Sequence, residues 1–448
     1  MLPLSTLRRE RGFESRALPR SEPGLWLREV LTTRCWLDER GKTERPGWSN
    51  RVSSIRSLTY SGSSRPPYDD SRPRNWGDQI RYRRLPIEAE SPEQFGYERI
   101  RFNLAESSVS DVPLRELAVD LDELILRYGD HLGTPALRAA IAADGPALDP
   151  DDVMVTPGAA AALFIVATSI LEPGDHVVVA RPNYATNVET PRAIGADVSY
   201  LDLTYEESWQ VDPARIAALM TPRTRLVSLT SPHNPTGAVM SEAILRDVIA
   251  LVEGSGARLL LDETYREMTF GEPLPVAASL SPLAISVSGL SKTYGLPGIR
   301  IGWLATQDGE LRDRFLAAKE QILITNSVVD EAIALEALRR RPTWLPAIRG
   351  RIDAALATTR RWIATDPTFE WIEPAGGVVG FPRIRSDVDV DVDRFYEILL
   401  QEYGTVVGPG HWFEQSRRHF RLGYGWPQPA ELEAGLAGLS WAAREAIR

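Results

Sequence analysis

From residue 150 onward, short runs rich in Val, Ile and Leu alternate with longer segments whose apolar residues repeat at helical spacing. Strands that are apolar throughout and separated by helices predict a mainly parallel sheet covered on both faces. In such sheets, ligands bind in the loops that follow the strands. The sequence therefore predicts an α/β fold with its chemistry in those loops. The expected strands are Asp152–Thr156, His176–Ala180, Arg225–Thr230, Arg258–Asp262, Leu283–Ser288 and Arg300–Ala305, and the expected helices include Ala159–Leu171 and Ser241–Val252.

Length and a change in composition divide the chain into regions. A chain of 448 residues predicts two or three domains. Before residue 90 the sequence is rich in Arg, Ser and Pro and lacks periodicity, so it cannot bury enough apolar surface to fold. We therefore expect a disordered extension over 1–90, although a basic arm for a partner is an alternative. A segment over 91–130 should join the small domain, with a large domain over 131–324 and a small α+β domain over 325–448.

Charge and cysteine content narrow the class of protein. The formal net charge of −10 argues against a general binder of nucleic acids or membrane surfaces, because both are polyanions. Cys35 is the only cysteine, so no intramolecular disulfide can form. We find no run of about 18 apolar residues that would span a membrane. The sequence predicts a soluble cytoplasmic protein without nucleic-acid or membrane partners.

Two loops of the predicted sheet suit an anion and a polar ring. The loop Thr156–Ala160 follows a strand and opens a helix with small residues, Gly158, Ala159 and Ala160, so backbone N–H groups can approach an anion. The loop Ser231–Gly237 contains two prolines and a glycine, which fix the direction of the Asn234 side chain. Each loop alone is also compatible with an ordinary structural turn.

Two further loops contain charged residues at the ends of buried strands. Asp262 ends an apolar strand, where a carboxylate is costly unless it meets a positive partner or caps a helix; Tyr265 follows three residues later. Lys292 lies between an apolar strand and a Gly/Pro-rich loop, with Arg300 eight residues further on. A desolvated lysine beside another cation has a lowered pKa, as an imine-forming amine requires.

Taken together and in this order, these four loops closely resemble the class I/II aminotransferases, which are fold-type-I pyridoxal-phosphate enzymes. The resemblance extends from about residue 100 to the C-terminus, and its most specific parts are the Asn-Pro-Thr-Gly loop, Asp262 with Tyr265, and the Ser-Lys block that ends at Arg300. It implies that Lys292 forms a Schiff base with pyridoxal 5'-phosphate, and that Asp262 keeps the pyridine nitrogen protonated. It also implies that Asn234 and Tyr265 bind the phenolic oxygen of the cofactor and that Tyr184 stacks on its ring. The residues that it implies for the phosphate are Arg300, Ser291 and the backbone at Gly158, Ala159 and Ala160.

The resemblance also assigns residues to the substrate and to a second subunit. Arg421 matches the arginine that binds the substrate carboxylate in a bidentate manner, with Asn234 nearby. Glu106 resembles a residue that enters the substrate pocket in related synthases, where a carboxylate could bind a cationic or polar side chain. Tyr128 resembles the tyrosine that reaches the phosphate of the partner subunit, which implies a homodimer with shared active sites. One departure is Gly289, where many members place a Ser or Thr donor to the phosphate, so that Ser288 or Ser291 would have to compensate.

The sequence leaves two enzymatic functions open and argues against a transcription regulator and a metal site. The leading function is an aminotransferase that acts on an amino acid and a 2-oxo acid. The alternative is elimination, replacement or cyclisation with the same cofactor, as in capreomycidine synthase. A transcription regulator would require a winged helix-turn-helix that the first 90 residues lack. We expect no metal site, because a calcium loop requires glycine where this chain has Val392 within the alternating series Asp387, Asp389, Asp391 and Asp393.

Overall fold

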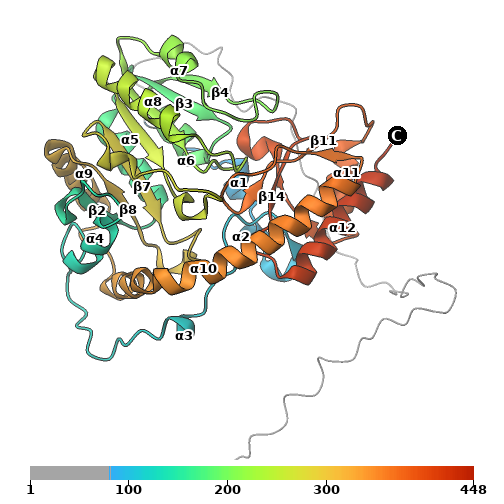
Figure 1. Ribbon diagram of the computed structural model, residues 1–448, viewed down its shortest axis with the longest axis horizontal. Helices are drawn as coiled ribbons and strands as arrows, with labels where there is room; N and C mark the ends of the chain where they lie inside the picture. The colour runs from blue at the N-terminus through green and yellow to red at the C-terminus, as the bar shows by residue number, and fades with distance from the viewer. Residues whose placement is uncertain (1–79, 81) are drawn as a thin grey trace, which may run out of the picture. The chain divides into compact units, whose positions relative to one another are not determined.

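The computed structural model describes residue 80 and residues 82–448, and its centre is a seven-stranded sheet (Figure 1). The strand order is β2-β8-β7-β6-β5-β3-β4, in which only β8 runs antiparallel to its neighbours. This confirms the predicted mainly parallel α/β sheet. The strands are β2 Val153–Thr156, β3 His176–Arg181, β4 Asp197–Asp202, β5 Thr224–Thr230, β6 Arg258–Asp262, β7 Ala284–Gly289 and β8 Gly302–Ala305.

Helices cover both faces of this sheet. Successive residues of a strand point to opposite faces, so each strand packs against helices on both sides. Val178 packs in a cluster with α7 and α8, whereas its neighbours Val177 and Val179 pack with α5, α6 and α9. The apolar character of both faces explains why these strands have no polar alternation. The helices of this region are α4 Pro135–Ala142, α5 Ala159–Ile170, α6 Ala185–Ile194, α7 Pro213–Leu219, α8 Glu242–Ser255 and α9 Gly309–Ile322, with short 3-10 turns at Pro150–Asp152, Arg266–Met268, Ala277–Ser279 and Pro297–Ile299.

The rest of the described chain forms an α+β region with its own apolar cluster, which includes Leu104, Phe395 and Phe420. The first strand of the described chain, β1, pairs in parallel with β12, so early and late segments meet here. Asp391 from the aspartate series accepts a hydrogen bond from Arg394 N and caps α11. The elements are β1 Phe102–Asn103, α3 Leu114–Leu117, α10 Val328–Thr365, β9 Phe369–Glu370, β10 Val379–Gly380, β11 Arg383–Ile384, α11 Val392–Gln401, β12 Thr405–Val406, β13 Gly408–Pro409, a 3-10 turn at Gly410–Phe413, β14 Phe420–Gly423 and α12 Pro429–Glu445.

Two predicted boundaries differ from the packing. The extension was predicted to run through residue 90, but residues 82–90 contain the short helix α1 (Pro86–Ala89), whose Ile87 is buried in the core. Next follow α2 (Pro92–Phe95) and a 3-10 turn at Tyr97–Arg99. The prediction for residues 1–79 lies outside the described residues. The second boundary was predicted between residues 324 and 325. Here α10 continues across residue 345, and its first half packs in the cluster of the large sheet while its second half packs in the cluster of the α+β region.

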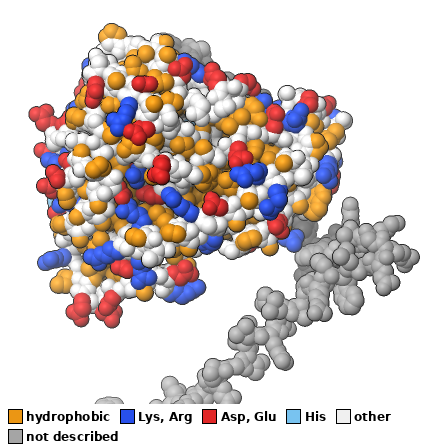
Figure 2. Space-filling view, in the orientation of Figure 1, with side chains coloured by type: hydrophobic (Ala, Val, Ile, Leu, Met, Phe, Trp, Pro, Cys, Tyr) orange, Lys and Arg blue, Asp and Glu red, His pale blue; other side chains and the backbone are white. Residues whose placement is uncertain are grey.

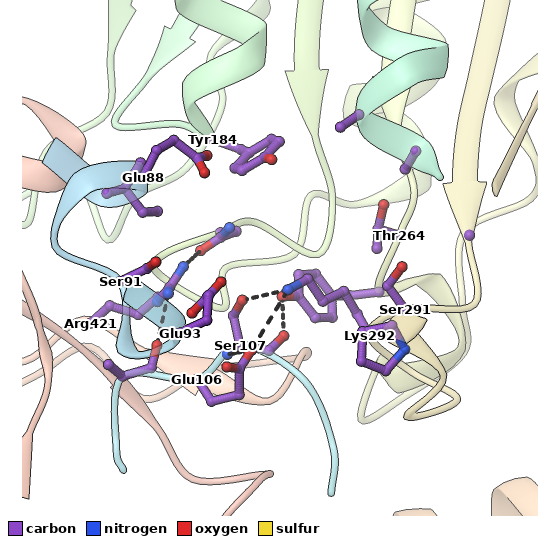
Figure 3. Close-up of a pocket in the computed structure, with 18 of the residues that line it drawn as sticks. Glu88, Ser91, Glu93, Glu106, Ser107, Tyr184, Thr264, Ser291, Lys292 and Arg421 are labelled. Atoms are coloured by element: carbon purple, nitrogen blue, oxygen red, sulfur yellow. Dashed lines mark hydrogen bonds and ion pairs between the residues drawn. The ribbon is translucent and has the colours of Figure 1, made fainter. Parts of the chain in front are cut away.

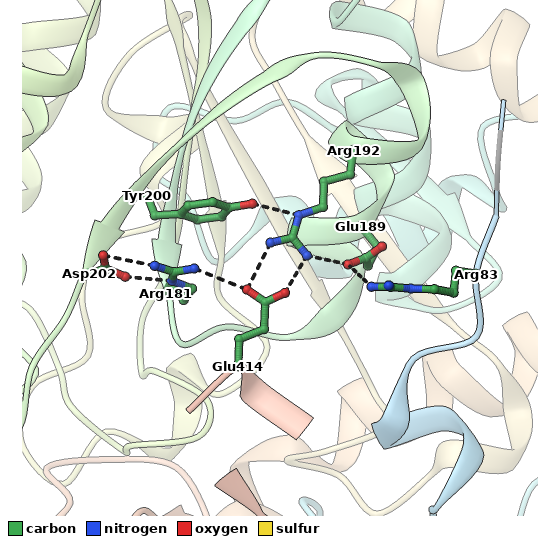
Figure 4. A network of polar contacts seen from close by, with 7 residues as sticks. All are labelled: Arg83, Arg181, Glu189, Arg192, Tyr200, Asp202 and Glu414. Atoms are coloured by element: carbon green, nitrogen blue, oxygen red, sulfur yellow. Dashed lines mark hydrogen bonds and ion pairs between the residues drawn. The ribbon is translucent and has the colours of Figure 1, made fainter. Parts of the chain in front are cut away.

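A polar network joins three separate segments around residue 414 (Figure 4). The Glu414 carboxylate accepts hydrogen bonds from Arg192 at 2.5 and 3.0 Å and from Arg181 at 3.4 Å. Glu189 in turn accepts from Arg192 at 2.5 Å and from Arg83 at 3.3 Å. The network therefore ties the segment before α1 and the turn before β14 to the large sheet.

Charged side chains of both signs are present on one face of the described chain. On the face drawn in Figure 2, basic and acidic side chains of the described residues are interspersed, without a continuous basic region. Within residues 82–448, no helix is both long and apolar enough to cross a bilayer.

Candidate active site

A cavity of about 400 Å³ lies at the carboxyl ends of β5, β6 and β7, where the predicted loops meet (Figure 3). It brings together every residue assigned from the sequence except Gly158, which lies just behind its wall, and Tyr128. The predicted residues that line it are Glu106, Ala159, Ala160, Tyr184, Asn234, Asp262, Tyr265, Ser291, Lys292, Arg300 and Arg421.

One end of the cavity is built around the start of α5. Gly158 caps this helix with φ +87°, and a Cβ atom here would lie 2.4 Å from Nη2 of Arg300. A Cβ on Gly302 would lie equally close to the backbone nitrogen of Ala159. These glycines let the helix N-terminus and the guanidinium approach each other. Unpaired N–H groups of a first helical turn beside an arginine form a site for a phosphate dianion.

The departure at Gly289 has a structural reason. A Cβ at this last residue of β7 would lie 3.1 Å from the carbonyl oxygen of Ile301 and 3.6 Å from Ala159 N, so the backbone is tightly packed here. Of the two predicted substitutes, Ser291 lines the cavity and lies 3.5 Å from Arg300 Nη1. Ser288, which precedes Gly289 on β7, does not line the cavity and donates to the carbonyl of Glu263 instead.

Asp262 ends β6 in a buried position. Its Oδ1 accepts hydrogen bonds from the backbone N and the hydroxyl of Thr264, at 3.1 and 2.6 Å. Burial raises the pKa of the Asp262 carboxyl, and the Thr264 hydrogen bonds offset this only in part. No salt bridge joins Asp262 to a basic side chain within the described residues. A buried carboxylate of this kind is suited to a protonated ring nitrogen, which would supply the missing positive charge.

Lys292 projects into the same cavity from the loop after β7. Its Nζ donates to Ser107 Oγ at 2.9 Å and lies 3.9 Å from Oε1 of Glu106. Burial lowers the pKa of the Lys292 ammonium, and the charges of Arg421 and Arg300 lower it further, while Glu106 opposes them. A larger share of neutral amine follows, and neutral amine is the form that acts as nucleophile and base.

Arg421 on β14 faces the cavity from the α+β side. It is only 5% exposed; Nη1 donates to Asn234 Oδ1 at 3.3 Å and Nη2 to the carbonyl of Ala105 at 2.7 Å, while Nε has no partner among the described residues. Its guanidinium carbon lies 5.2 Å from the ring centre of Phe413. A buried cation with a free donor is suited to a carboxylate ligand. Tyr265 donates its hydroxyl to the carbonyl of Ser107, and burial raises its pKa strongly.

Tyr128 is not part of this cavity. Its side chain is 78% exposed on the segment between α3 and α4. This segment is held to the large domain by Lys319 Nζ, which donates to the carbonyl of His131, and by Glu331, which accepts from Thr134 N at 2.7 Å. Tyr128 therefore does not line the cavity of its own chain.

Sequence reasoning missed the wall contributed by the N-terminal segment. Besides Ser107, this wall includes carboxylates and polar residues that precede or follow β1. A signal was present, because Ser91 and Pro92 are the N-cap and first residue that typically begin a helix. The missed lining residues of the segment are Glu88, Ser91, Glu93, Tyr97 and Asp111.

The donor set fits pyridoxal 5'-phosphate. The α5 N-terminus with Arg300 suits the phosphate, the buried Asp262 suits a pyridinium, and Lys292 has the amine to which the aldehyde would be attached. Tyr184, the N-cap residue of α6, adds an aromatic ring to the cavity wall.

Comparisons with known proteins agree with this fit. Residues 104–439 match the family model of class I and II aminotransferases. Capreomycidine synthase of Streptomyces vinaceus is 34% identical over 330 residues, which are 72% of this chain and 82% of that protein. Arginine–pyruvate transaminase of Pseudomonas aeruginosa is 31% identical over 328 residues, 70% of this chain and 82% of that protein.

A solved structure shows the same architecture. The PLP-dependent cyclase OrfR superposes with a TM-score of 0.74 at 30% identity, covering 84% of this chain and 99% of that one. The fold is thus that of fold-type-I enzymes, and the cofactor is pyridoxal 5'-phosphate, as the sequence predicted. The chain belongs to the class I and II aminotransferase family.

Proposed function

We propose that this protein is an aminotransferase that moves the amino group of an L-amino acid to a 2-oxo acid. The observation that carries this proposal is that Lys292 and Arg421 face one cavity that Asp262 also lines. An amine for the reacting carbon and a guanidinium for the carboxylate are the two groups that an α-amino acid requires. Bound pyridoxal phosphate supplies an electron sink for negative charge that develops at the substrate's Cα.

The residues divide the work by position. Arg300 and the first turn of α5 hold the phosphate, and Asp262 holds a proton at the ring nitrogen. Arg421 orients the substrate carboxylate, so that Cα lies toward Lys292. As a neutral amine, Lys292 Nζ accepts the proton from Cα and can return it at a neighbouring atom. Burial lowers the pKa of Lys292 and so increases the share of this neutral form.

A second candidate function is elimination or cyclisation with the same cofactor. Glu106 favours it, because its carboxylate lies 3.9 Å from Lys292 Nζ and adds a second acid–base group to the reacting region. Such a group can protonate a group that leaves from Cβ, which transamination does not require. The similarity to capreomycidine synthase and to a PLP-dependent cyclase supports this candidate.

One experiment separates the two functions. The holoenzyme is incubated with an amino acid in excess and no 2-oxo acid, and the product is quantified against enzyme. Transamination should stop after one equivalent and resume when a 2-oxo acid is added. Continued turnover without an acceptor would contradict the aminotransferase and favour elimination or cyclisation.

We also propose a homodimer in which Tyr128 reaches the partner's cofactor site. Besides Tyr128, its neighbours Ile125 and Leu126 are 70% and 76% exposed, and apolar side chains so exposed favour contact with another molecule. Light scattering should give twice the chain mass of 49.8 kDa. Tyr128→Phe should reduce cofactor retention without changing that mass, and a monomeric active enzyme would contradict the proposal.

We place the enzyme in the cytoplasm. This proposal is supported by the single Cys35, which leaves no possibility of an intramolecular disulfide. Fractionation of cells that express the full chain tests it, with activity expected in the cytosolic fraction.

A further inference from the structure

Four carboxylates from the N-terminal segment of the described chain line the cavity. Glu88 and Glu93 come from α1 and α2, and Glu106 and Asp111 follow β1. The α5 end of the cavity, by contrast, carries Arg300. The cavity thus has a cationic end and an acidic side wall.

Three of these carboxylates surround one phenol. The pKa of Tyr97 is raised to about 12, first by burial and then by the charges of Glu106, Glu93 and Asp111. Burial also raises the pKa of the Asp111 carboxyl, and Glu106 raises it further, against the hydrogen bond from Trp426. Glu106 and Asp111 therefore repel each other, and this wall of the cavity concentrates carboxylates.

The basic groups of the cavity are already engaged. Under the proposed function, Arg300 binds the phosphate, Lys292 the cofactor aldehyde, and Arg421 the α-carboxylate. The unpartnered Nε of Arg421, in a side chain only 5% exposed, independently indicates an anionic ligand at that point. None of the three cations then remains to balance the acidic wall.

Which part of a substrate contacts the acidic wall depends on where this wall lies relative to Arg421. Glu93 and Glu106 act electrostatically on both Lys292 and Arg421, and Figure 3 draws them in the part of the cavity between these two residues. An amino acid with its carboxylate on Arg421 and its Cα at Lys292 would therefore direct its side chain toward this wall.

We propose that the substrate is an L-amino acid with a planar cationic side chain of the guanidinium class, selected by Glu93, Glu106 and Asp111. This inference rests on the proposed function. A guanidinium donates hydrogen bonds at its edge to several carboxylates and stacks its face on an aromatic ring. Tyr97 offers such a ring, because it lines the cavity while half of its surface is exposed.

Other side chains fit less well. An acidic side chain would face three like charges, and an apolar one would desolvate carboxylates without pairing them. A flexible ammonium would satisfy the charge but not the planar stacking. The expected order of affinity is guanidinium, then ammonium, then neutral and acidic side chains.

The test uses the holoenzyme and four probes: L-arginine, its uncharged isostere L-citrulline, L-norleucine and L-glutamate. The change in absorption of the bound cofactor gives a dissociation constant for each amino acid without requiring turnover. Arginine should bind about tenfold or more tightly than citrulline, because the two differ in charge and hardly in shape. Equal affinities for arginine, citrulline and norleucine would overturn the inference and leave the proposed function standing.

Variants of the acidic wall test whether its residues cause the preference for arginine. Glu93→Gln and Asp111→Asn should each weaken arginine binding several-fold and leave citrulline binding unchanged. Glu98→Gln is the matched control, since Glu98 lies on the same segment but is exposed outside the cavity. If the preference for arginine survives in both variants, the assigned residues are wrong. If no amino acid changes the absorption at all, the proposed function fails together with the inference.

Discussion

A Cβ atom on Gly158 would lie 2.4 Å from Nη2 of Arg300, which makes this glycine and this arginine mutually dependent. The backbone of Gly158 has φ +87°, a region that side chains with a Cβ rarely adopt. Both observations place a steric limit at the proposed phosphate end of the cavity, where the helix start and the guanidinium must meet.

Gly158→Ala should therefore displace Arg300 and reduce retention of pyridoxal phosphate, with the fold preserved. Absorption of the bound cofactor after dialysis measures retention, and circular dichroism monitors the fold. Gly254→Ala is the control, since a Cβ on Gly254 meets no atom within 4 Å. Full retention by Gly158→Ala would show that the phosphate does not bind here.

Lys292→Ala should abolish covalent attachment of the cofactor. Borohydride reduction of the holoenzyme followed by peptide mapping should find the label on the peptide that contains Lys292. The buried Lys319, whose pKa is lowered to about 8 chiefly by burial, is the natural control because it lies outside the cavity. A label on Lys319 or any other lysine would contradict the assignment.

Arg421→Lys should impair substrate binding much more than cofactor binding. The charge survives, but the planar guanidinium that contacts Asn234 and Ala105 does not. Loss of a charge-assisted pair in a closed site costs on the order of 2–5 kcal/mol, or about 1.5 to 3.5 decades in kcat/KM.

Arg300→Lys is the counterpart of this variant and should weaken cofactor retention first. Dissociation constants for amino acid and cofactor, measured on both variants, distinguish the two roles. If Arg421→Lys were the variant that loses the cofactor, the placement of the two arginines would be reversed.

Stability should fall in mild acid because His233 is buried as the neutral form. Burial lowers its pKa from 6.5 to about 4, against the hydrogen bond to the Pro182 carbonyl, which acts to raise it. The unfolded chain therefore binds more protons between these values, and the stability present above pH 6.5 is lost as the pH falls toward 4. At about 1.4 kcal/mol per pKa unit, the loss is about 3 kcal/mol.

His233→Gln should flatten this dependence, which thermal unfolding between pH 7.5 and 4.5 can measure. Glutamine retains a donor for the Pro182 carbonyl but does not titrate. His131→Gln serves as control, since its side chain is about half exposed. An unchanged slope in His233→Gln would show that other groups cause the acid sensitivity.

Two truncations test the N-terminal boundary. Removal of residues 1–79 should leave fold and activity largely intact, as the lack of core-forming pattern predicts. Removal of residues 1–95 should preserve cofactor binding but weaken amino-acid binding, because Glu88 and Glu93 line the cavity and Glu90 accepts hydrogen bonds from His411 and Trp412 at 2.8 Å. Equal activity of both truncated proteins would contradict the role given to this segment.

The sequence predicts the central sheet well because its strands are buried on both faces. Arg258–Asp262 was expected and is observed as β6, and the other predicted strands differ by one or two residues at their ends. The strand β4, Asp197–Asp202, was not expected, since it lies at the edge and most of its residues are only half buried. Its half-exposed residues lack the continuous apolar run that identifies the other strands of the sheet, including the buried edge strand β2.

The loops that follow the buried strands could be predicted from the sequence as part of the site, whereas the segment of α1 and α2 could not. Lys292, Asp262 and Asn234 lie in loops with distinctive local sequence directly after buried strands, so periodicity and motif locate them together. The helices α1 and α2 have only four residues each, and contacts such as that between Glu90 and His411 hold them in place. Contacts over such a sequence distance leave no local pattern, so the helix-start pair Ser91-Pro92 is the one signal for this segment noted in the sequence.

The parallel pairing of β1 with β12 has a consequence for how the enzyme matures. Phe102 aligns with Thr405 and Asn103 with Val406, so β1 has no strand partner until the last part of the chain is synthesised. The seven-stranded sheet is complete at Ala305. Since synthesis proceeds from the N-terminus and domains fold as units, a nascent chain can acquire its cofactor site while Arg421 is still untranslated. The grip on the substrate's α-carboxylate is then the last property that the growing polypeptide gains.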